Sequence, residues 1–419
     1  MSIIQASIPL FFVLIAAELV WAQTTGRRVL RLNDSLSDLS CGILSQLAGI
    51  FTKLFTVGIY IWVAERARVQ LFVPAIPEWP AQGAVSWVVV FVLVDLCYYF
   101  SHRYAHEINI LWAGHVVHHQ SEEYNLPVAL RQSALHGLMS WVFYIPLALM
   151  GVPWQLFVAC NAINLVYQFW IHTRAIGRMG RLTEAVMNTP SHHRVHHGVN
   201  PEYQDRNYAG VFIIWDRLFG TFVAERQEPV YGITKPLNSW NPLWANVHVF
   251  VQIARDAWKA RRWPDKLRIV FGRPGWKPPE LGETERPRPV TAETFEKYDP
   301  PVPAPLAGYA FAQFVAALVA GFALLQRADD IPLSLAAAPA FFIALALAGV
   351  GGVFERAKWA RPLETARLLT TAVACAGLLL TGLAPGLVAW GGLAFSVLSL
   401  VVLWVFRSEL TRTELAPLM

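Results

Sequence analysis

Eight histidines stand in three short groups whose spacing suits metal binding. HRYAH contains His102 and His106, HVVHH contains His115, His118 and His119, and HRVHH contains His193, His196 and His197. Residues three or four positions apart on a helix project from one face, so each group would present its imidazoles together. Neutral imidazole binds iron, zinc, copper and nickel, and eight ligands exceed what one tetrahedral or octahedral ion accepts. The pattern predicts two metal ions, each held by about four nitrogens.

The remaining histidines have simpler interpretations. His192 precedes HRVHH and would point away from His193 on a helix, so we expect it to support the ligands rather than join them. His136 and His248 stand alone and are expected to be ordinary core or surface residues. Spacing does not fix the metal, so a structural zinc site is an alternative at this point.

Two acids are candidate catalytic residues. Asp95 ends the apolar run before His102, and an ionisable residue at membrane depth is a functional candidate. Alternatively, its carboxylate only orients a neighbouring histidine. Glu107 follows His106 directly and could orient an imidazole or contact a polar substrate head. Glu122 or Glu123 could do the same, although we expect both more readily to be solvated surface acids.

The composition predicts that these residues lie in an integral membrane protein. Hydrophobic side chains make up 55% of the 419 residues and charged ones only 15%, which is unusually apolar. Windows long enough to cross a bilayer predict an all-α, polytopic protein with about nine transmembrane helices. Two of them, 133–150 and 153–171, are short and joined only by Gly151, Val152 and Pro153, so they could instead form a re-entrant pair. The windows are approximately 6–23, 42–63, 84–101, 133–150, 153–171, 306–326, 332–353, 365–383 and 386–406.

The charges near the first window predict the orientation. Arg27, Arg28 and Arg31 follow it, which places its C-terminal end in the cytoplasm. The window is not a signal peptide, because no positive residue precedes it and Glu18 interrupts it. Alternating the later spans puts every histidine group on the cytoplasmic side. An excess of arginine over lysine hints at a bacterial inner membrane, with the endoplasmic reticulum as the eukaryotic equivalent.

Proline and charged residues are dense between 271 and 305, which is linker composition. We therefore expect a membrane domain with the metal site at 1–300 and a four-helix membrane domain at 301–419. The amphipathic stretch 244–263 could lie on the membrane interface or be a plain surface helix. The net charge of +5 comes without a basic helix or an aromatic nucleic-acid motif, so nucleic acid is not an expected partner.

HxxxH, HxxHH and HxxHH beside membrane spans resemble the fatty acid hydroxylase/sterol desaturase superfamily. The phrases HEINILWAGHVVHHQSEEYNLPVALRQS, LVYQFWIHT, NTPSHHRVHHGVN and NYAGVFIIWDRLFGTF resemble its branch of glyceryl-ether (alkylglycerol) monooxygenases. The resemblance implies two iron ions held by the eight histidines, with His172 of QFWIH as a further ligand. Gln168, one turn earlier, stands where some relatives have histidine, which leaves a tenth ligand position open.

The resemblance also implies the reaction. Dioxygen would be activated to hydroxylate the carbon next to the ether oxygen of an alkylglycerol, and the product would collapse to a fatty aldehyde. Tetrahydrobiopterin is the implied reductant. Otherwise a separate electron donor is needed, since the chain carries no fused cytochrome or flavin module. Two alternatives stay open: a sterol or fatty-acyl hydroxylase or desaturase of the same superfamily, and a non-catalytic zinc-binding membrane protein.

Overall fold

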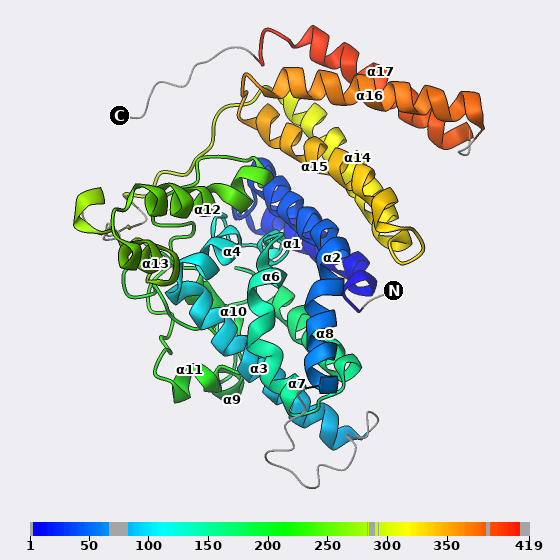
Figure 1. The fold of residues 1–419 in the computed structure, drawn as a ribbon. Helices are drawn as coiled ribbons and strands as arrows, with labels where there is room; N and C mark the ends of the chain where they lie inside the picture. The colour runs from blue at the N-terminus through cyan, green and yellow to red at the C-terminus, as the bar shows by residue number, and fades with distance from the viewer. Residues whose placement is uncertain are drawn as a thin grey trace. The chain divides into compact units, whose positions relative to one another are not determined.

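The computed structural model describes residues 3–66, 83–282, 284, 290–291, 293–382 and 386–410, and the described residues form helices and loops without a named strand. Figure 1 shows the helices in chain order. Those before residue 300 are α1 (Ile3–Thr25), α2 (Leu32–Arg66), α3 (Ala84–Glu107), α4 (Asn109–His119), α5 (Leu126–Ala129), α6 (His136–Ser140), η1 (Trp141–Tyr144), α7 (Ile145–Leu149), α8 (Trp154–Trp170), α9 (Arg181–Val186), α10 (Pro190–His196), α11 (Ile214–Leu218), α12 (Pro242–Lys259), α13 (Trp263–Phe271) and η2 (Pro279–Leu281). They are followed by α14 (Ala304–Arg327), α15 (Leu333–Phe354), α16 (Ala360–Thr381) and α17 (Gly386–Val405).

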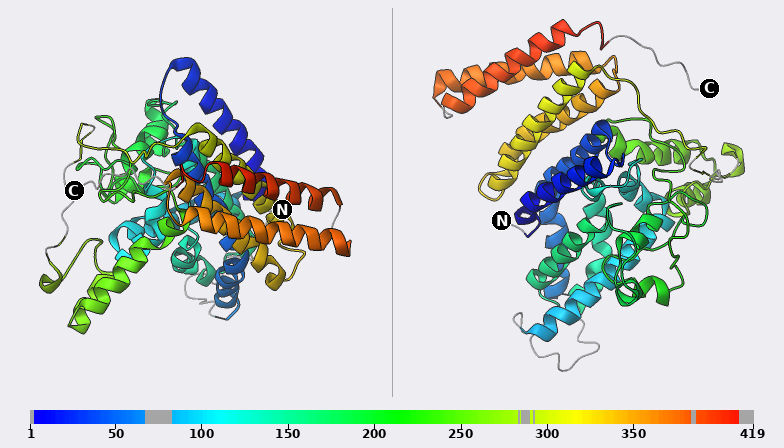
Figure 2. Two further views of the ribbon diagram at one scale, coloured as in Figure 1. Left: turned by 90° about the horizontal axis from the view of Figure 1, so that it is seen from above. Right: turned by 180° about the vertical axis from the view of Figure 1, so that it is seen from behind.

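The chain divides into two compact units. The N-terminal unit comprises Met1–Leu237 and Asn246–Lys297, and the C-terminal unit comprises Asn238–Ala245 and Tyr298–Met419. The N-terminal unit contains every histidine group. The C-terminal unit contains α14 to α17, which pack in sequence, each helix against the next (Figure 2).

Seven helices in the described ranges are long and apolar enough to cross a membrane, namely α1, α2, α3 and α14 to α17. They make the protein a multi-pass membrane protein. The predicted number of nine is not confirmed, because window 133–150 is broken into α6, η1 and α7. Pro146 is the second residue of the last of these pieces, and α8 after it has only 17 residues. The alternative of a re-entrant hairpin fits this shape, and it leaves both chain ends of the hairpin on one side.

The hairpin packs along α3 and reaches the far end of α2. The Tyr60 hydroxyl of α2 donates to the Val152 carbonyl at the tip of the hairpin at 2.9 Å. Val90 and Val94 of α3 are fully buried in the same apolar core as Leu147. The packing brings the C-terminal ends of α3 and α8 to the same level, where His102 and His172 stand.

A break at Ile108 turns the chain between the first two histidine groups. Ile108 has an extended backbone (φ −117°, ψ 121°), which ends α3 and starts α4 in a new direction. Asn109 fixes that direction, since its side-chain amide donates to the Ile269 carbonyl at 2.8 Å and its backbone N–H to the Gly272 carbonyl at 2.9 Å. Because of this turn, the histidines of α4 face those of α3.

A buried polar network joins helices of the C-terminal unit. Arg367 of α16 donates to both oxygens of Glu364, at 2.9 and 2.7 Å, and the Tyr309 hydroxyl of α14 donates to the same carboxylate at 2.5 Å. Arg367 also donates to Gln313, whose amide donates to Ser399 of α17 at 2.7 Å. Glu364 is fully buried, so these partners are what make its charge tolerable between apolar helices.

Gly349 of α15 leaves the space that the Glu364 carboxylate occupies. We expect Gly349→Ala to lower the thermal unfolding temperature in detergent by an amount corresponding to about 1–3 kcal/mol, because its methyl group would overlap the Glu364 carboxylate. Gly377→Ala on α16 is the matched control, since a Cβ there meets no atom within 4 Å. Equal unfolding temperatures for the two variants would contradict the assigned packing.

Candidate metal centre

Nine histidines of the N-terminal unit gather into two groups, and they are the nine named from the sequence. In each group the candidate ligand nitrogens all lie within 4.8 Å of one another. The first group takes residues from α3, α4 and α10, and the second adds the turn after α8. Group one is His102, His106, His115, His119 and His196, and group two is His118, His172, His193 and His197.

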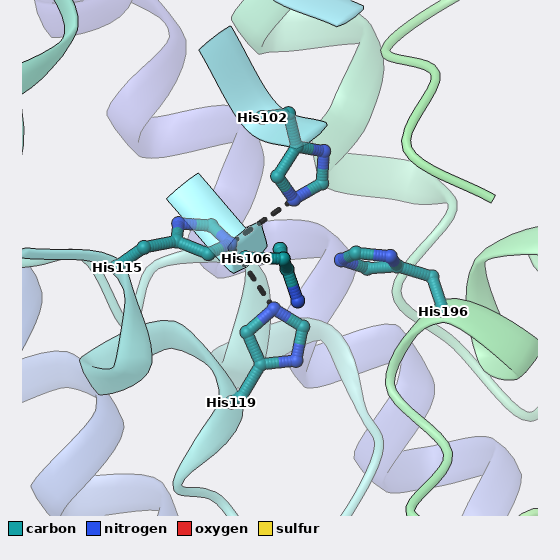
Figure 3. A group of neighbouring side chains, drawn as sticks. All are labelled: His102, His106, His115, His119 and His196. Carbon is teal, nitrogen blue, oxygen red and sulfur yellow. Dashed lines mark hydrogen bonds between the residues drawn. The ribbon is translucent and has the colours of Figure 1, made fainter. Parts of the chain in front are cut away.

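The rings of group one point at a common centre. Figure 3 shows His115 linked to His102 and to His119, with His106 and His196 directed into the same space. The Nε2 atoms of His102 and His115 are 3.0 Å apart, and those of His115 and His119 are 3.1 Å apart. Two nitrogens bound at right angles to one ion, each at about 2.1 Å, are about 3.0 Å apart. The spacing therefore fits ligands that share an ion.

The rings of group two also bring their nitrogens close together. His172 Nε2 lies 3.2 Å from His118 Nε2 and 3.0 Å from His193 Nε2. The His118 and His197 rings are 4.6 Å apart between centroids. His118 and His119 are adjacent on α4 and serve different groups, as do His196 and His197 at the end of α10. Each of these two helices thus contributes to both groups.

Backbone carbonyls hold the second ring nitrogen of four histidines. The Nδ1 atoms of His102, His118, His172 and His196 lie 2.7, 3.1, 2.7 and 2.9 Å from carbonyl oxygens. A carbonyl only accepts, so Nδ1 must carry the proton and Nε2 presents its lone pair. The accepting carbonyls belong, in the same order, to Tyr208, Arg131, Gln168 and Arg206.

Burial keeps these imidazoles neutral. It lowers the pKa of the α4 and α10 ligands well below the ordinary value for histidine, and neighbouring imidazoles lower it further. Burial also lowers the pKa of His172 to about 4. At neutral pH the rings are therefore uncharged and available as metal ligands.

The donor set fits a metal pair. The Nε2 atoms of His106, His196 and His197 are buried and have no hydrogen-bond partner, which is costly unless another atom binds them. Zinc in structural sites takes four ligands, whereas group one offers five nitrogens. Five or more nitrogen and oxygen ligands suit iron, whose oxygenase sites keep positions open for other ligands.

Two buried carboxylates fix the loop that supplies the carbonyls of Arg206 and Tyr208. Asp216 accepts the backbone N–H groups of Tyr208 and Ala209, both at 2.8 Å. Asp95 accepts the N–H groups of Val211 and Phe212 at 2.8 and 3.0 Å. Asp216 therefore holds the carbonyl that orients His102, and Asp95 ties the following residues to α3.

Arg131 holds the end of α4. Its guanidinium donates to the Val117 carbonyl at 2.6 Å and to the Gln120 side chain at 2.8 Å, on either side of His118 and His119. It also donates to Asp38 of α2 at 3.1 Å, and both residues are almost fully buried. The Ser121 hydroxyl also donates to the Asp38 carboxylate, at 3.4 Å, so this buried acid has two polar partners. The α4 ligands are thus anchored to α2.

The predicted catalytic acids lie outside both histidine groups. The carboxylate of Asp95 accepts four hydrogen bonds, the other two coming from the Asn164 amide at 2.7 Å and the Trp215 indole at 2.9 Å. None of these four donors is a histidine, so the contacts indicate that Asp95 holds the loop rather than orienting a ring directly. Glu107 pairs with Arg103 at 2.9 Å and is partly exposed. A catalytic role for either acid stays a prediction.

The expectation that Glu122 and Glu123 are solvated is wrong. Both are buried, and Arg31 pairs with them at 3.1 and 2.8 Å, while Lys297 also binds Glu123. Sequence reasoning missed this because Arg31 is about ninety residues away and its charge was assigned to membrane orientation. The hydrogen bonds instead join the start of α2 to the loop that follows His119.

Three further residues, His192, Gln168 and Asp205, lie close to the two histidine groups without belonging to them. His192 pairs with Glu184 at 3.0 Å and lies outside the groups, as expected. The Gln168 amide donates to Asn164, so the contact with His172 comes from the Gln168 carbonyl. Asp205 was not predicted, and its carboxylate lies 3.6 Å from His106 Nδ1. Its left-handed backbone (φ 56°) marks a turn whose sequence signal, EYQDRN, was weak.

We expect Asp216→Asn to speed hydrogen exchange at the Tyr208 and Ala209 amides, measured by mass spectrometry on the purified protein. An asparagine amide cannot accept both backbone N–H groups and the Thr221 hydroxyl that Asp216 accepts. The opening free energy should fall by about 1–3 kcal/mol. Asp205→Asn, at an exposed carboxylate, is the control and should leave exchange in this loop unchanged.

Comparison with known proteins agrees with this geometry. The family model described as "Fatty acid hydroxylase" matches residues 87–221, which contain all nine histidines. No solved structure matches the chain. An ornithine lipid hydroxylase from Rhizobium tropici matches a shorter part of the chain. It is 31% identical over 34% of this chain and 44% of its own length.

Two full-length relatives are more informative. The alkylglycerol monooxygenase of Xenopus tropicalis is 38% identical over 86% of this chain and 79% of its own length. That of Homo sapiens is 40% identical over 87% of this chain and 81% of its own length. Similarity therefore extends well beyond the residues that the family model matches, and this chain belongs to the alkylglycerol monooxygenase family within the fatty acid hydroxylases.

Proposed function

We propose that the protein is a di-iron, dioxygen-dependent membrane monooxygenase that cleaves the ether bond of alkylglycerol-like lipids. Its family makes it a lipid monooxygenase, and the Xenopus and human relatives are named for alkylglycerols. The observation that carries the proposal is the pair of adjacent buried histidine groups, one of five nitrogens and one of four. A sterol or fatty-acyl hydroxylase or desaturase with the same centre is the alternative, and a zinc-binding protein without activity is less consistent with the family.

The nine histidines of the two groups would hold the ions. When bound, a di-iron pair supplies activation of dioxygen for insertion of one oxygen atom into a C–H bond. The protein's own residues orient the histidine rings and keep water out of the site. The carbonyls of Tyr208 and Arg131 fix the His102 and His118 rings, and burial excludes water from both groups.

The proposed reaction balances with an external two-electron donor. Ether lipid, dioxygen, two electrons and two protons give one water and a lipid whose hydroxyl is on the carbon next to the ether oxygen. That hemiacetal then breaks its bond to the ether oxygen, which leaves on the glycerol as a hydroxyl, while the chain is released as an aldehyde. The family resemblance favours tetrahydrobiopterin as the donor, and a separate electron-transfer protein is the other possibility.

We also propose that the site faces the cytoplasm. Arg27, Arg28 and Arg31 follow α1, which supports that side for the ends of α1 and α3. The host membrane would be a bacterial inner membrane, or the endoplasmic reticulum in a eukaryote. Residues 1–300 would form the hydroxylase domain and residues 301–419 a separate four-helix membrane domain. The division of compact units between Lys297 and Tyr298 supports this boundary.

His193→Ala should lower the metal content of the purified protein from about two ions per chain towards one, because it removes one of four nitrogens from group two. His192→Ala is the matched control one residue earlier, where the ring contacts Glu184 instead. Elemental analysis by mass spectrometry gives the stoichiometry and identifies the metal. Two ions in both variants would disprove the ligand assignment, and zinc alone in the wild type would disprove the iron centre.

Membranes containing the protein should release fatty aldehyde from a 1-O-alkylglycerol only when dioxygen and a reduced pterin or ferredoxin are both supplied. A monoacylglycerol of equal chain length lacks the ether carbon and should give no aldehyde. Mass spectrometry of the lipids distinguishes the alternatives, since retained chains bearing a new hydroxyl or double bond would instead support the sterol or fatty-acyl reaction.

A further inference from the structure

An apolar surface lies on the N-terminal unit outside the candidate spans. Leu182 of α9 is 81% exposed and Leu218 of α11 is 70% exposed. Val186, Ile214 and Phe219 on the same helices or beside them are also exposed. Single exposed apolar residues are ordinary, but a group of this kind marks a surface that contacts a partner or a membrane. The sequence alone does not predict this surface, because the segment around it is polar and is expected on the cytoplasmic side.

The two short helices form one surface. The Arg217 side chain of α11 donates to the Glu184 carbonyl of α9 at 3.0 Å. Met187 directly follows α9 and forms an antiparallel bridge with Phe212, which lies two residues before α11 begins. We call the exposed side chains Leu182, Val186, Ile214, Leu218 and Phe219 the α9–α11 surface.

The α9–α11 surface is fixed to the middle of a membrane-spanning helix. Asp95, near the centre of α3, accepts the N–H groups of Val211 and Phe212, and the Phe212 ring packs edge-on against Phe91 of α3 at 6.0 Å. Figure 1 accordingly shows α9 and α11 beside α3 rather than beyond its end. Phe219 stacks on Tyr99, one turn further along α3, at 5.2 Å. Exposed groups held at this depth along a span must lie close to lipid.

The charges around the surface suit an anionic membrane. Arg178, Arg181 and Arg217 are exposed on or beside the two helices. Glu184 points inward, where it accepts hydrogen bonds from Thr189 and Ser191 and pairs with His192. The exposed fringe is therefore basic around an apolar centre, which is the pattern of interfacial membrane anchors.

We infer that the α9–α11 surface inserts into the bilayer interface and binds anionic lipid through its arginine fringe. α10, which carries His193 and His196 and is followed directly by His197, is separated from the end of α9 by three residues. The anchored surface therefore holds the metal centre beside the lipid phase. Its use as the side from which a lipid substrate enters rests on the proposed function, whereas the insertion itself does not.

Nitroxide labels at Leu182→Cys and Leu218→Cys test the insertion in the full-length protein, reconstituted in nanodiscs of phosphatidylcholine and phosphatidylglycerol. Dioxygen concentrates in the hydrocarbon and a nickel chelate stays in water, so power-saturation electron paramagnetic resonance reports the depth of each label. We expect a dioxygen-to-nickel collision ratio several-fold higher than for Glu202→Cys, an exposed polar position on the same unit. Labelled wild-type protein gives the background from Cys97 and Cys375, which are partly buried.

Ratios at Leu182 and Leu218 equal to that at Glu202 would overturn the inference and leave the surface for a protein partner. Arg178→Gln combined with Arg181→Gln should lower both ratios in the anionic nanodiscs, and unchanged ratios would overturn the role of anionic lipid. Neither readout depends on turnover. Failure of the proposed ether-lipid reaction would therefore leave this result standing, and the reverse is also true.

Discussion

The constraint on which the structure depends is the burial of nine imidazoles within two adjoining clusters. Each ring has two nitrogens, and a buried nitrogen without a partner costs free energy. The protein meets this requirement in two ways. Carbonyls accept the Nδ1 protons of His102, His118, His172 and His196. The Nε2 atom of His102 lies 3.0 Å from that of His115, and the Nε2 atoms of His118 and His172 are 3.2 Å apart. Convergent lone pairs repel without a cation between them, so the fold is arranged around metal ions.

The need for carbonyl acceptors explains why the centre combines helices with irregular chain. Within a helix most carbonyls already accept a backbone N–H, so a free acceptor comes most easily from a turn, a loop or a helix end. Gln168 lies in the last turn of α8, Arg131 follows α5, and Arg206 and Tyr208 lie in the loop between α10 and α11. Asp216 and the Arg131–Asp38 pair then hold these segments. Charged residues of the site therefore act largely through the backbone.

The sequence predicted which histidines come together, because their spacing is local. HxxxH and HxxHH place rings on one helical face, and the structure gathers all eight of these histidines with His172, whereas their binding of metal stays a prediction. Apolar length likewise identified the seven long spans. What the sequence could not supply was pairing at long range. Arg31 pairs with Glu122 and Glu123 across about ninety residues, which only the tertiary fold brings together. The break at η1 likewise depends on packing against α3.

The membrane explains the position of Asp95. Irregular backbone beside a spanning helix has no water to satisfy its N–H groups, so the protein must supply acceptors itself. A single carboxylate on α3 accepts two backbone amides, the Trp215 indole and the Asn164 amide of α8. Gly210 allows this approach, since a Cβ there would come within 2.9 Å of the Asp95 and Asn164 oxygens. An acid that looks catalytic in the sequence thus allows a loop carrying a ligand-orienting carbonyl to pack against a membrane helix, and the metal centre can lie beside the bilayer that contains its substrate.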